Sequence, residues 1–495
     1  MPSNLDTAYS AAYTALTKCA ELTAVLQPHQ IRVRDRLKNQ SGLVVAHGLG
    51  TGKTLSSIAA ADALSMPTTV VVPAALQANY RKELGQHRKE KDQGFSVTSL
   101  QRIARGKTSP DLHNHLLIVD EAHRLREPSG SSRQVFNKLK TEKRLLLTAS
   151  PIYNHPADLA SLVNLAAGEH LLPVDRGNFE KAFTRTEVTH PGLIGRLMGV
   201  KPGEHKVLTN TKHLKGVLDK WVDFHESTDK KDFPSSDVKV IKVPMSEKQQ
   251  EVNNALLNKA PIWVQYKIRK GLPPSKQEAT KLNSFLAMQR QVSNSPQAYS
   301  HGMSLGEAVS HSPKIQLAAH NFMSALQKNP NHKAVVYSNY LQSGLHPYKH
   351  ILEHHKVPYG VFSGEMPKEE RDQLVRDYNQ NKIKALLIST AGAEGLDLKG
   401  TRQIQILDPH FNDEKINQVV GRGIRYKSHT HLPAAERHVS VERYLATNRP
   451  SRWSLMDNKK DISADEYIHN LAQDKMKFNN QFTALLRPPP VPKNP

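Results

Sequence analysis

The chain has 495 residues, of which 38% are hydrophobic and 23% charged, an ordinary globular composition that excludes a disordered or fibrous protein. Its single cysteine, Cys19, excludes a disulfide framework and zinc sites built on cysteines. Lys and Arg number 68 against 46 Asp and Glu, a net charge of +22. Such a positive field favours a polyanion such as nucleic acid as the partner. No apolar run predicts a membrane-spanning helix and the N-terminus does not resemble a signal peptide, so we expect an intracellular protein without a membrane partner.

In chain order, two stretches alternate between short apolar runs and helical patterns. The first stretch predicts the strands Leu43–Ala46, Thr68–Pro73, Leu116–Asp120 and Leu145–Thr148. The second predicts the strands Lys333–Ser338, Pro358–Phe362, Lys384–Thr390, Gln403–Asp408 and His438–Leu445. Alternation of this kind predicts parallel sheets with helical crossovers, hence an α/β fold with two lobes.

The intervening residues, 171–312, have a different sequence pattern, with residues typical of turns, a basic bias and helical segments such as Ser246–Leu257. Between residues 196 and 270 there are 15 Lys and Arg against 9 Asp and Glu. We expect a helix-rich basic insertion here, since structureless loops of this length are uncommon. The basic bias fits a DNA-facing surface and a solvated surface equally well. The tail predicts one helix, Ser463–Leu486, before a proline-rich end.

Residues 46–54 (AHGLGTGKT) follow an apolar strand and precede a helical pattern, which is the context of a phosphate-binding loop. Glycines allow backbone N–H groups to surround phosphate oxygens, and the helix N-terminus adds partial positive charge. Lys53 can reach the β- and γ-phosphates, and the Thr54 hydroxyl can hold Mg²⁺. His47 stands where the strict template has glycine, so the match is to the shorter G-x-G-K-T core. The predicted loop residues are Gly48, Leu49, Gly50, Thr51, Gly52, Lys53 and Thr54.

Two acids end the predicted strand Leu116–Asp120, in the sequence 116–123 (LLIVDEAH). The carboxyl ends of strands in a doubly wound sheet face the nucleotide. We therefore expect Asp120 to orient Mg²⁺ and Glu121 to polarise the attacking water. An exposed turn would explain one acid but not a pair that follows a phosphate loop.

Residues 418–425 (QVVGRGIR) predict a helix after the strand Gln403–Asp408. Arg422 and Arg425 are three residues apart and project from one face of it. Two guanidinium groups in the second lobe are candidate arginine fingers for the γ-phosphate.

These motifs, in this order, resemble superfamily 2 helicases, and specifically the Swi/Snf-like ATPases. The resemblance spans roughly residues 25–446 and is carried by segments 26–30, 46–54, 71–80, 120–123, 144–154, 242–249, 336–339, 389–398 and 418–425. It implies two RecA-like parallel-sheet lobes, ATP and Mg²⁺ as cofactors, and a DEAH box at 120–123. The implied divisions are 1–170 for lobe 1 with ATP binding, 171–312 for the insertion, 313–448 for lobe 2 and 449–495 for the C-terminal helix and tail.

The resemblance also implies roles for further residues. Gln30 would read adenine, and Gly395 and Asp397 would contribute to the nucleotide site from the second lobe. His123, Ser150 and Gln418 would couple hydrolysis to contact with the nucleic-acid strand.

A closer likeness is to helicases of large DNA viruses, including the poxvirus nucleoside triphosphatase I type, on residues 426–441 and 463–468. The resemblance implies an ATP-driven motor that translocates on double-stranded DNA, with transcription or replication proteins as partners. The sequence does not give the oligomeric state, for which we favour a monomer. A viral protein of this kind would act in the host cytoplasm or the virion, and a cellular one in the nucleus. The alternatives are a strand-unwinding DNA or RNA helicase and a non-enzymatic nucleic-acid scaffold.

Residues 350–354 (HILEH) formally match an inverted zinc-protease pattern. They fall in a helical stretch between two predicted strands of the second lobe, where the family has a crossover helix. We interpret them as part of that helix.

Overall fold

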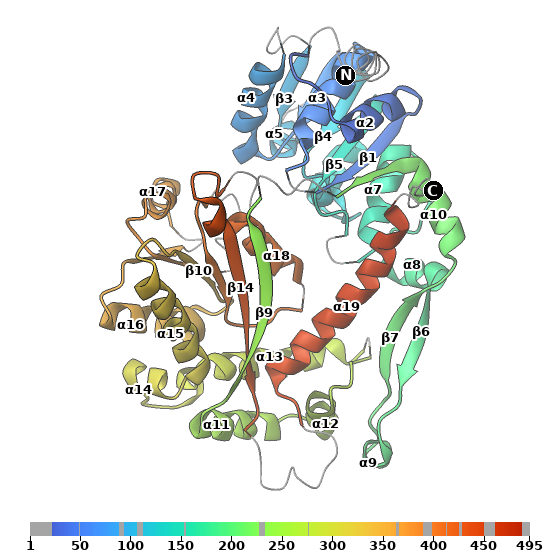
Figure 1. Ribbon diagram of the computed structural model, residues 1–495. Helices are drawn as coiled ribbons and strands as arrows, with labels where there is room; N and C mark the ends of the chain where they lie inside the picture. The colour runs from blue at the N-terminus through green and yellow to red at the C-terminus, as the bar shows by residue number, and fades with distance from the viewer. Residues whose placement is uncertain are drawn as a thin grey trace, which may run out of the picture. The chain divides into compact units, whose positions relative to one another are not determined.

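The computed structural model forms two compact units, each built on a parallel sheet (Figure 1). Unit 1 comprises residues 1–185, 207–228 and 478–495, and unit 2 comprises residues 186–206 and 229–477. The structure describes residues 22–48, 50–88, 94–105, 112–152, 155–226, 233–275, 277–362, 366–389, 398–411, 413–424, 428–449 and 461–487. The prediction of an α/β fold with two parallel-sheet lobes is confirmed.

The described strands of unit 1 run parallel in the order β3-β2-β4-β5-β1-β8. Their bounds are β1 Gly42–His47, β2 Thr68–Val71, β3 Phe95–Thr98, β4 Leu112–Val119, β5 Thr141–Thr148 and β8 Val222–His225. Four of them match the predicted strands. The sequence did not predict β3, a partly exposed edge strand, or β8, whose Val-Asp-Phe-His run carries two polar side chains.

Alternate residues of β1 face two different cores, as the two-residue period of a strand requires. Leu43 and Val45 pack with helices α2 (Pro28–Lys38), α3 (Lys53–Leu64) and α4 (Gln77–His87). Val44 and Ala46 face the opposite core. That core contains side chains from α6 (Ser131–Asn137), α7 (Ala157–Ala167), α8 (Arg176–Phe183) and α10 (Thr211–Trp221). The sheet is thus covered on both faces, which holds the ends of its strands in fixed positions.

Unit 2 repeats this plan, with described strands parallel in the order β11-β12-β10-β13-β14-β9. Their bounds are β9 Ser235–Pro244, β10 Ala334–Tyr337, β11 Tyr359–Phe362, β12 Ala385–Ile388, β13 Gln403–Ile406 and β14 His438–Thr447. All five predicted strands of this lobe are present. Helices α15 (Pro313–Lys328) and α16 (His346–His354) pack in one core, and Ile416 and Val419 of α18 (Asp413–Gly423) pack in another. The histidine pattern at 350–354 lies in α16, as predicted for a crossover helix.

Residues 171–312 contribute to both sheets. They form α8, α9 (Leu193–Leu197), α10, α11 (Glu247–Asn258), α12 (Ile262–Lys270), α13 (Ala279–Asn294) and α14 (Leu305–Ser310). They also supply β8 to unit 1, β9 to unit 2, and a two-stranded ribbon of β6 (Thr184–Thr189) and β7 (Gly203–Leu208). β9 follows α10 by way of β8 but joins the sheet of unit 2 beside β14, so the segment expected as an insertion links the two sheets.

The C-terminal helix α19 spans Ala464–Leu486, within one residue of its predicted bounds. Tyr467 and Ile468 pack in a helical core of unit 2, whereas Phe482 and Leu486 pack in a core of unit 1. Among the described helices, none combines the length and apolar character needed to cross a bilayer.

Candidate active site

The predicted phosphate loop lies at the carboxyl end of β1. This strand ends at His47 and α3 begins at Lys53. Gly50 and Gly52 have φ angles of 75° and 72°, a region that residues with a Cβ rarely adopt. A Cβ on Gly52 would also lie 2.6 Å from Nε2 of Gln30. Glycine at this position therefore permits both the left-handed backbone and the close approach of α2.

Side chains of the loop bond back to its own backbone. The Thr51 hydroxyl donates to the carbonyl of Gly48 at 2.9 Å. The Lys53 ammonium group donates to the carbonyls of His47 and Gly48 at 3.1 and 3.0 Å. Burial lowers the pKa of Lys53, and the charges of the two acids at 120 and 121 oppose that shift. The ammonium group thus lies within the loop, in reach of a phosphate bound there. Thr54 is the second residue of α3, and Leu49 lies outside the described residues.

Asp120 and Glu121 follow β4 directly, at the same edge of the sheet. The backbone N–H of Asp120 donates to the carbonyl of Val71 at 2.9 Å, which ties the end of β4 to β2. Burial, together with the charge of Glu121, raises the pKa of Asp120 to about 6. Burial would also raise the pKa of Glu121, but hydrogen bonding and the charge of His123 lower it overall. Glu121 has a φ of 51°, so its backbone is in the left-handed region that disfavours a side chain.

The residues predicted to couple hydrolysis to strand contact lie near the same edge. His123 Nδ1 is 3.2 Å from Oε2 of Glu121, so the histidine contacts the proposed water-polarising acid directly. Ser150 follows β5, and its backbone N–H donates to the Thr148 hydroxyl at 3.1 Å. Since β5 lies between β4 and β1, the structure brings both residues to the edge that carries the loop and the acids.

Gln30 lies on α2 against the phosphate loop and is buried. Its Oε1 accepts from the backbone N–H of Gln27 at 2.9 Å, which caps the helix. Its Nε2 lies 3.4 Å from the carbonyls of Thr51 and Gly52. The structure therefore joins the residue expected to read the base to the loop expected to hold the phosphates.

A pocket of about 380 Å³, counting open solvent, lies beside the acid pair in unit 1. Its lining combines the ends of β2 and β4 with α5 (Leu100–Arg105) and α6. Asp120, Glu121 and Arg124 line it, together with Pro73 of segment 71–80, one of those that carry the family resemblance. The acids thus face a hollow and not a filled core.

The sequence did not single out the residues that hold the loop from the other side. Asp223 on β8 is within hydrogen-bonding distance of His47, and the backbone N–H of Gly48 donates to the carbonyl of His225 at 2.9 Å. No local signal marks these residues, because β8 is 176 residues away from the loop along the chain.

In unit 2, α18 contains Gln418 and Arg422, as the helix prediction required. The structure describes only the backbone at these two positions. Arg425, Gly395 and Asp397 lie outside the described residues. The predicted roles of these five residues stay predictions.

The carboxyl end of β10 and β13 in unit 2 is held by a buried polar network around Asp408. This carboxylate accepts hydrogen bonds from Ser338, Asn339, Asn294 of α13 and Arg290 of α13. The Ser-Asn pair belongs to the segment resembling a second-lobe motif. The network therefore joins that motif to α13, a helix of the region that precedes the lobe.

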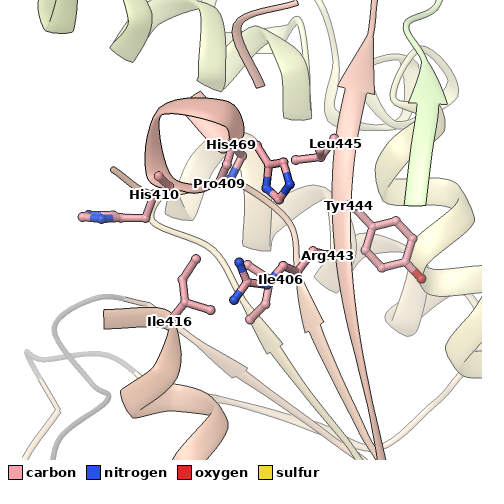
Figure 2. Close-up of a pocket in the computed structure, with 9 residues that line it drawn as sticks. Ile406, Pro409, His410, Ile416, Arg443, Tyr444, Leu445 and His469 are labelled. Carbon is pink, nitrogen blue, oxygen red and sulfur yellow. The ribbon is translucent and has the colours of Figure 1, made fainter. Parts of the chain in front are cut away.

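A second pocket, of about 250 Å³ counting open solvent, lies entirely in unit 2 (Figure 2). It is formed by β13 and the residues after it, β14, α18 and α19, with Ile406, His410, Ile416, Arg443 and His469 in its lining. None of the predicted site residues lines it.

Comparison with known proteins identifies the family of the chain. Residues 69–298 match the model of the SNF2-related domain, and residues 315–427 match the helicase conserved C-terminal domain. The putative ATP-dependent RNA helicase L538 of Acanthamoeba polyphaga mimivirus is 30% identical, over 93% of this chain and 96% of the relative. A termination factor NPH-I homolog of African swine fever virus is 26% identical, over 91% of this chain and 76% of the relative.

More distant matches are of the same kind. The nucleoside triphosphatase I of Melanoplus sanguinipes entomopoxvirus is 24% identical, over 75% of this chain and 61% of the relative. The solved SWI2/SNF2 ATPase core of Sulfolobus solfataricus in complex with dsDNA aligns over 95% of this chain and 98% of that chain, with 18% identity and a TM-score of 0.37. The assignment rests on the sequence matches: this chain is an ATP hydrolase of the SNF2-related helicase family, with relatives in mimivirus, African swine fever virus and an entomopoxvirus.

Proposed function

We propose that this ATP hydrolase is a motor that translocates on double-stranded DNA. The observation that supports it most is the convergence of Lys53, Asp120 and Glu121 at one edge of a parallel sheet, on a chain of net charge +22. The first feature supplies a nucleotide site, and the second supplies attraction to a polyanion.

In this proposal the backbone N–H groups of the loop and the Lys53 ammonium group bind the phosphates of ATP. Glu121, whose pKa is lowered, is ionised at neutral pH and orients the attacking water. The Gln30 amide recognises the base. Arg422 and Arg425 act as arginine fingers on the γ-phosphate, with Gly395 and Asp397 contributing to the same site.

The residues at the site fit Mg²⁺. A hydroxyl from Thr54 and a carboxylate from Asp120 are oxygen donors of the kind this cation prefers. Burial and the charge of Glu121 raise the pKa of Asp120 to about 6, and a bound cation would favour its ionised form. When bound, Mg²⁺ would neutralise developing charge on the phosphates.

His123 and Ser150 are proposed to transmit the state of the nucleotide to the DNA-contacting surface, with Gln418 acting in the second lobe. The contact of His123 with Glu121 supports this, since a change in charge at the acid is felt at 3.2 Å. The viral relatives suggest the host cytoplasm or the virion as the place of action, and transcription or replication proteins as partners.

A strand-unwinding helicase is the second candidate, and one observation favours it. The ribbon of β6 and β7 carries α9, where Leu193, Ile194 and Leu197 are 75%, 65% and 82% exposed. Apolar side chains at the tip of an arm can enter between base steps as a wedge. A mimivirus relative is also named an RNA helicase.

A panel of activators tests the proposed substrate. ATPase activity is measured with duplex DNA, single-stranded DNA, duplex RNA and single-stranded RNA at equal nucleotide concentration and fixed salt. Strongest activation by duplex DNA supports the proposal. Stronger activation by either RNA, or no activation by any nucleic acid, contradicts it.

A further inference from the structure

The strongest unassigned feature of unit 1 is a buried polar cluster behind the phosphate loop. Its centre is Asp223 on β8, whose side chain is completely buried. Three basic or aromatic side chains converge on this one carboxylate. They are His47 at the start of the loop, and Arg32 and Arg36 on α2.

The geometry of the contacts is tight. Nε2 of His47 donates to Oδ1 of Asp223 at 2.7 Å. Arg32 binds the same carboxylate with two nitrogens, Nε to Oδ2 at 2.7 Å and Nη2 to Oδ1 at 2.8 Å. Nη1 of Arg36 donates to Oδ2 at 3.2 Å. A two-nitrogen contact of this kind fixes orientation as well as distance.

The charge state of the cluster is set by the same contacts. Burial opposes ionisation of Asp223, but the hydrogen bonds from His47 and Arg32 hold the pKa of its carboxyl well below the ordinary value. Burial lowers the pKa of His47. Nδ1 of His47 is buried without a hydrogen-bond partner in the described part of the chain, which suits a neutral ring with its proton on Nε2.

The cluster joins the two elements that the proposed function assigns to the base and to the phosphates of ATP. Arg32 and Arg36 lie on α2, the helix that carries Gln30. His47 is the last residue of β1 and precedes the first loop glycine. His29 of α2 adds two further contacts. Its Nε2 donates to the carbonyl of Thr51 in the loop at 2.8 Å, and its ring stacks on that of His225 of β8 with the ring centroids 4.0 Å apart.

We propose that Asp223 is a positioning residue of the ATP site, which holds the phosphate loop and the base-contacting helix in register through one carboxylate. This rests on the proposed assignment of the ATP site. It also explains why histidine, and not the glycine of the strict template, stands at position 47: the imidazole supplies the N–H that reaches β8. Loosening the loop weakens the binding of ATP and of the transition state alike, so the effect falls on KM more than on kcat.

The test compares KM and kcat for ATP in the full chain, with the thermal midpoint as a measure of folding. D223N and H47G should each raise KM by about tenfold, a loss of about 1.4 kcal/mol, with little change in kcat. H47Q should restore KM close to that of the unchanged chain, because the glutamine Nε2 can donate to Asp223 from the same position.

D62N is the matched control, since Asp62, near the C-terminal end of α3, forms another buried ion pair of unit 1 with Arg88, at 3.0 Å. It should lower the thermal midpoint without raising KM. A KM unchanged in D223N and H47G, or raised equally in D62N, overturns the proposal. If D223N does not fold, the comparison of H47G with H47Q decides it. K53A distinguishes failure of the proposed ATP site from failure of the proposed role of Asp223. A K53A chain that still hydrolyses ATP refutes the ATP site. An inactive K53A chain together with a D223N chain of normal KM refutes only the role of Asp223.

Discussion

Asp120 and Glu121 are adjacent in the chain, yet their surroundings move their pKa values in opposite directions. Burial and the neighbouring charge raise the pKa of Asp120 to about 6. Burial acts in the same direction on Glu121, but the hydrogen bond and charge of His123, together with the charges of Lys53 and Arg124, lower its pKa overall. Pairs of acids separated in this way have separate tasks. The ionised Glu121 suits the activation of water, and the buried carboxyl of Asp120 suits a cation.

Replacing Lys53 by alanine should abolish ATP turnover and leave DNA binding largely intact. The ammonium group lies inside the loop, 3.1 and 3.0 Å from its carbonyls, whereas the positive charge of the chain is spread over 68 Lys and Arg. ATPase rates and DNA affinity measured on one preparation check this. K82A, on an exposed turn of α4, is the charge-matched control and should keep both activities. Hydrolysis by K53A near the normal rate would show that the loop is misassigned.

Replacing Arg425 by alanine should preserve ATP binding and reduce hydrolysis by roughly 10³-fold or more, the usual effect of losing an arginine finger. The reason is that a finger stabilises charge that develops only in the transition state. Single-turnover rates and the affinity for a fluorescent ATP analogue separate the two effects. R422A serves as the comparison. Equal losses in affinity and rate would indicate ground-state binding, and normal hydrolysis by R425A would assign the role to Arg422.

Replacing Asp408 by alanine should destabilise the chain by about 3–5 kcal/mol, the usual cost of removing one partner of a buried ion pair. The carboxylate is fully buried, and its loss removes the ionic partner of Arg290, which keeps a hydrogen bond to the Pro409 carbonyl, and the acceptor of the Asn294 amide. Urea unfolding followed by far-UV circular dichroism measures the change. D237A is the control, because the ion pairs of Asp237 on β9 are exposed and should contribute little. Equal midpoints for the two variants would contradict the importance of the network.

Acid should destabilise unit 1 through the histidines near the phosphate loop. Burial lowers the pKa of His29, His47 and His225 below the ordinary value of 6.5, to about 4 for His225. The folded state then binds fewer protons than the unfolded state, so stability is full above pH 6.5 and declines as pH falls from there toward 4. Asp120 opposes the decline below its pKa of about 6.

The contribution of His225 to the loss of stability in acid is measured by comparing a variant that lacks this histidine with the unchanged chain. Thermal midpoints of the unchanged chain and of H225Q are compared from pH 7.5 to pH 4.5, and the variant should lose less stability across that range. H320Q, on the exposed side of α15, should follow the unchanged chain. Parallel curves for H225Q and the unchanged chain would show that His225 titrates equally in the folded and unfolded states.

The part of this site that could be predicted is the part formed by contiguous sequence motifs. The loop glycines, Lys53 and the acid pair each depend on local geometry at the end of one apolar strand, and that strand is visible as a run. The role of Asp223 could not be predicted, because it reaches the loop only when β8 pairs with β1, and Asp223 and His47 are 176 residues apart in the chain. The apolar pattern did not indicate β9 for a similar reason, although the resemblance covers its last residues, 242–244. Most of its side chains are exposed, so it has no apolar run, and its place is set by pairing with β14.

The last prediction is that the motor translocates on duplex DNA without separating its strands. Unwinding needs a wedge that breaks stacking worth about 1.4 kcal/mol per base-pair step. The predicted strands of the second lobe suggest no aromatic-tipped hairpin, and the one candidate wedge in the described residues is the apolar α9. The grip on DNA should be electrostatic, so DNA-stimulated ATPase activity should decline steeply with salt and show little sequence preference.

Two assays on one preparation decide between translocation and unwinding: displacement of a third strand from a triplex, and opening of a forked duplex. We expect ATP-dependent triplex displacement without fork opening. A chain in which Leu193, Ile194 and Leu197 are all changed to serine should displace the third strand at the normal rate, because a motor that grips phosphates does not use these side chains. Efficient fork opening by the unchanged chain would refute the prediction, and its loss in the triple-serine chain would identify α9 as the wedge of an unwinding helicase.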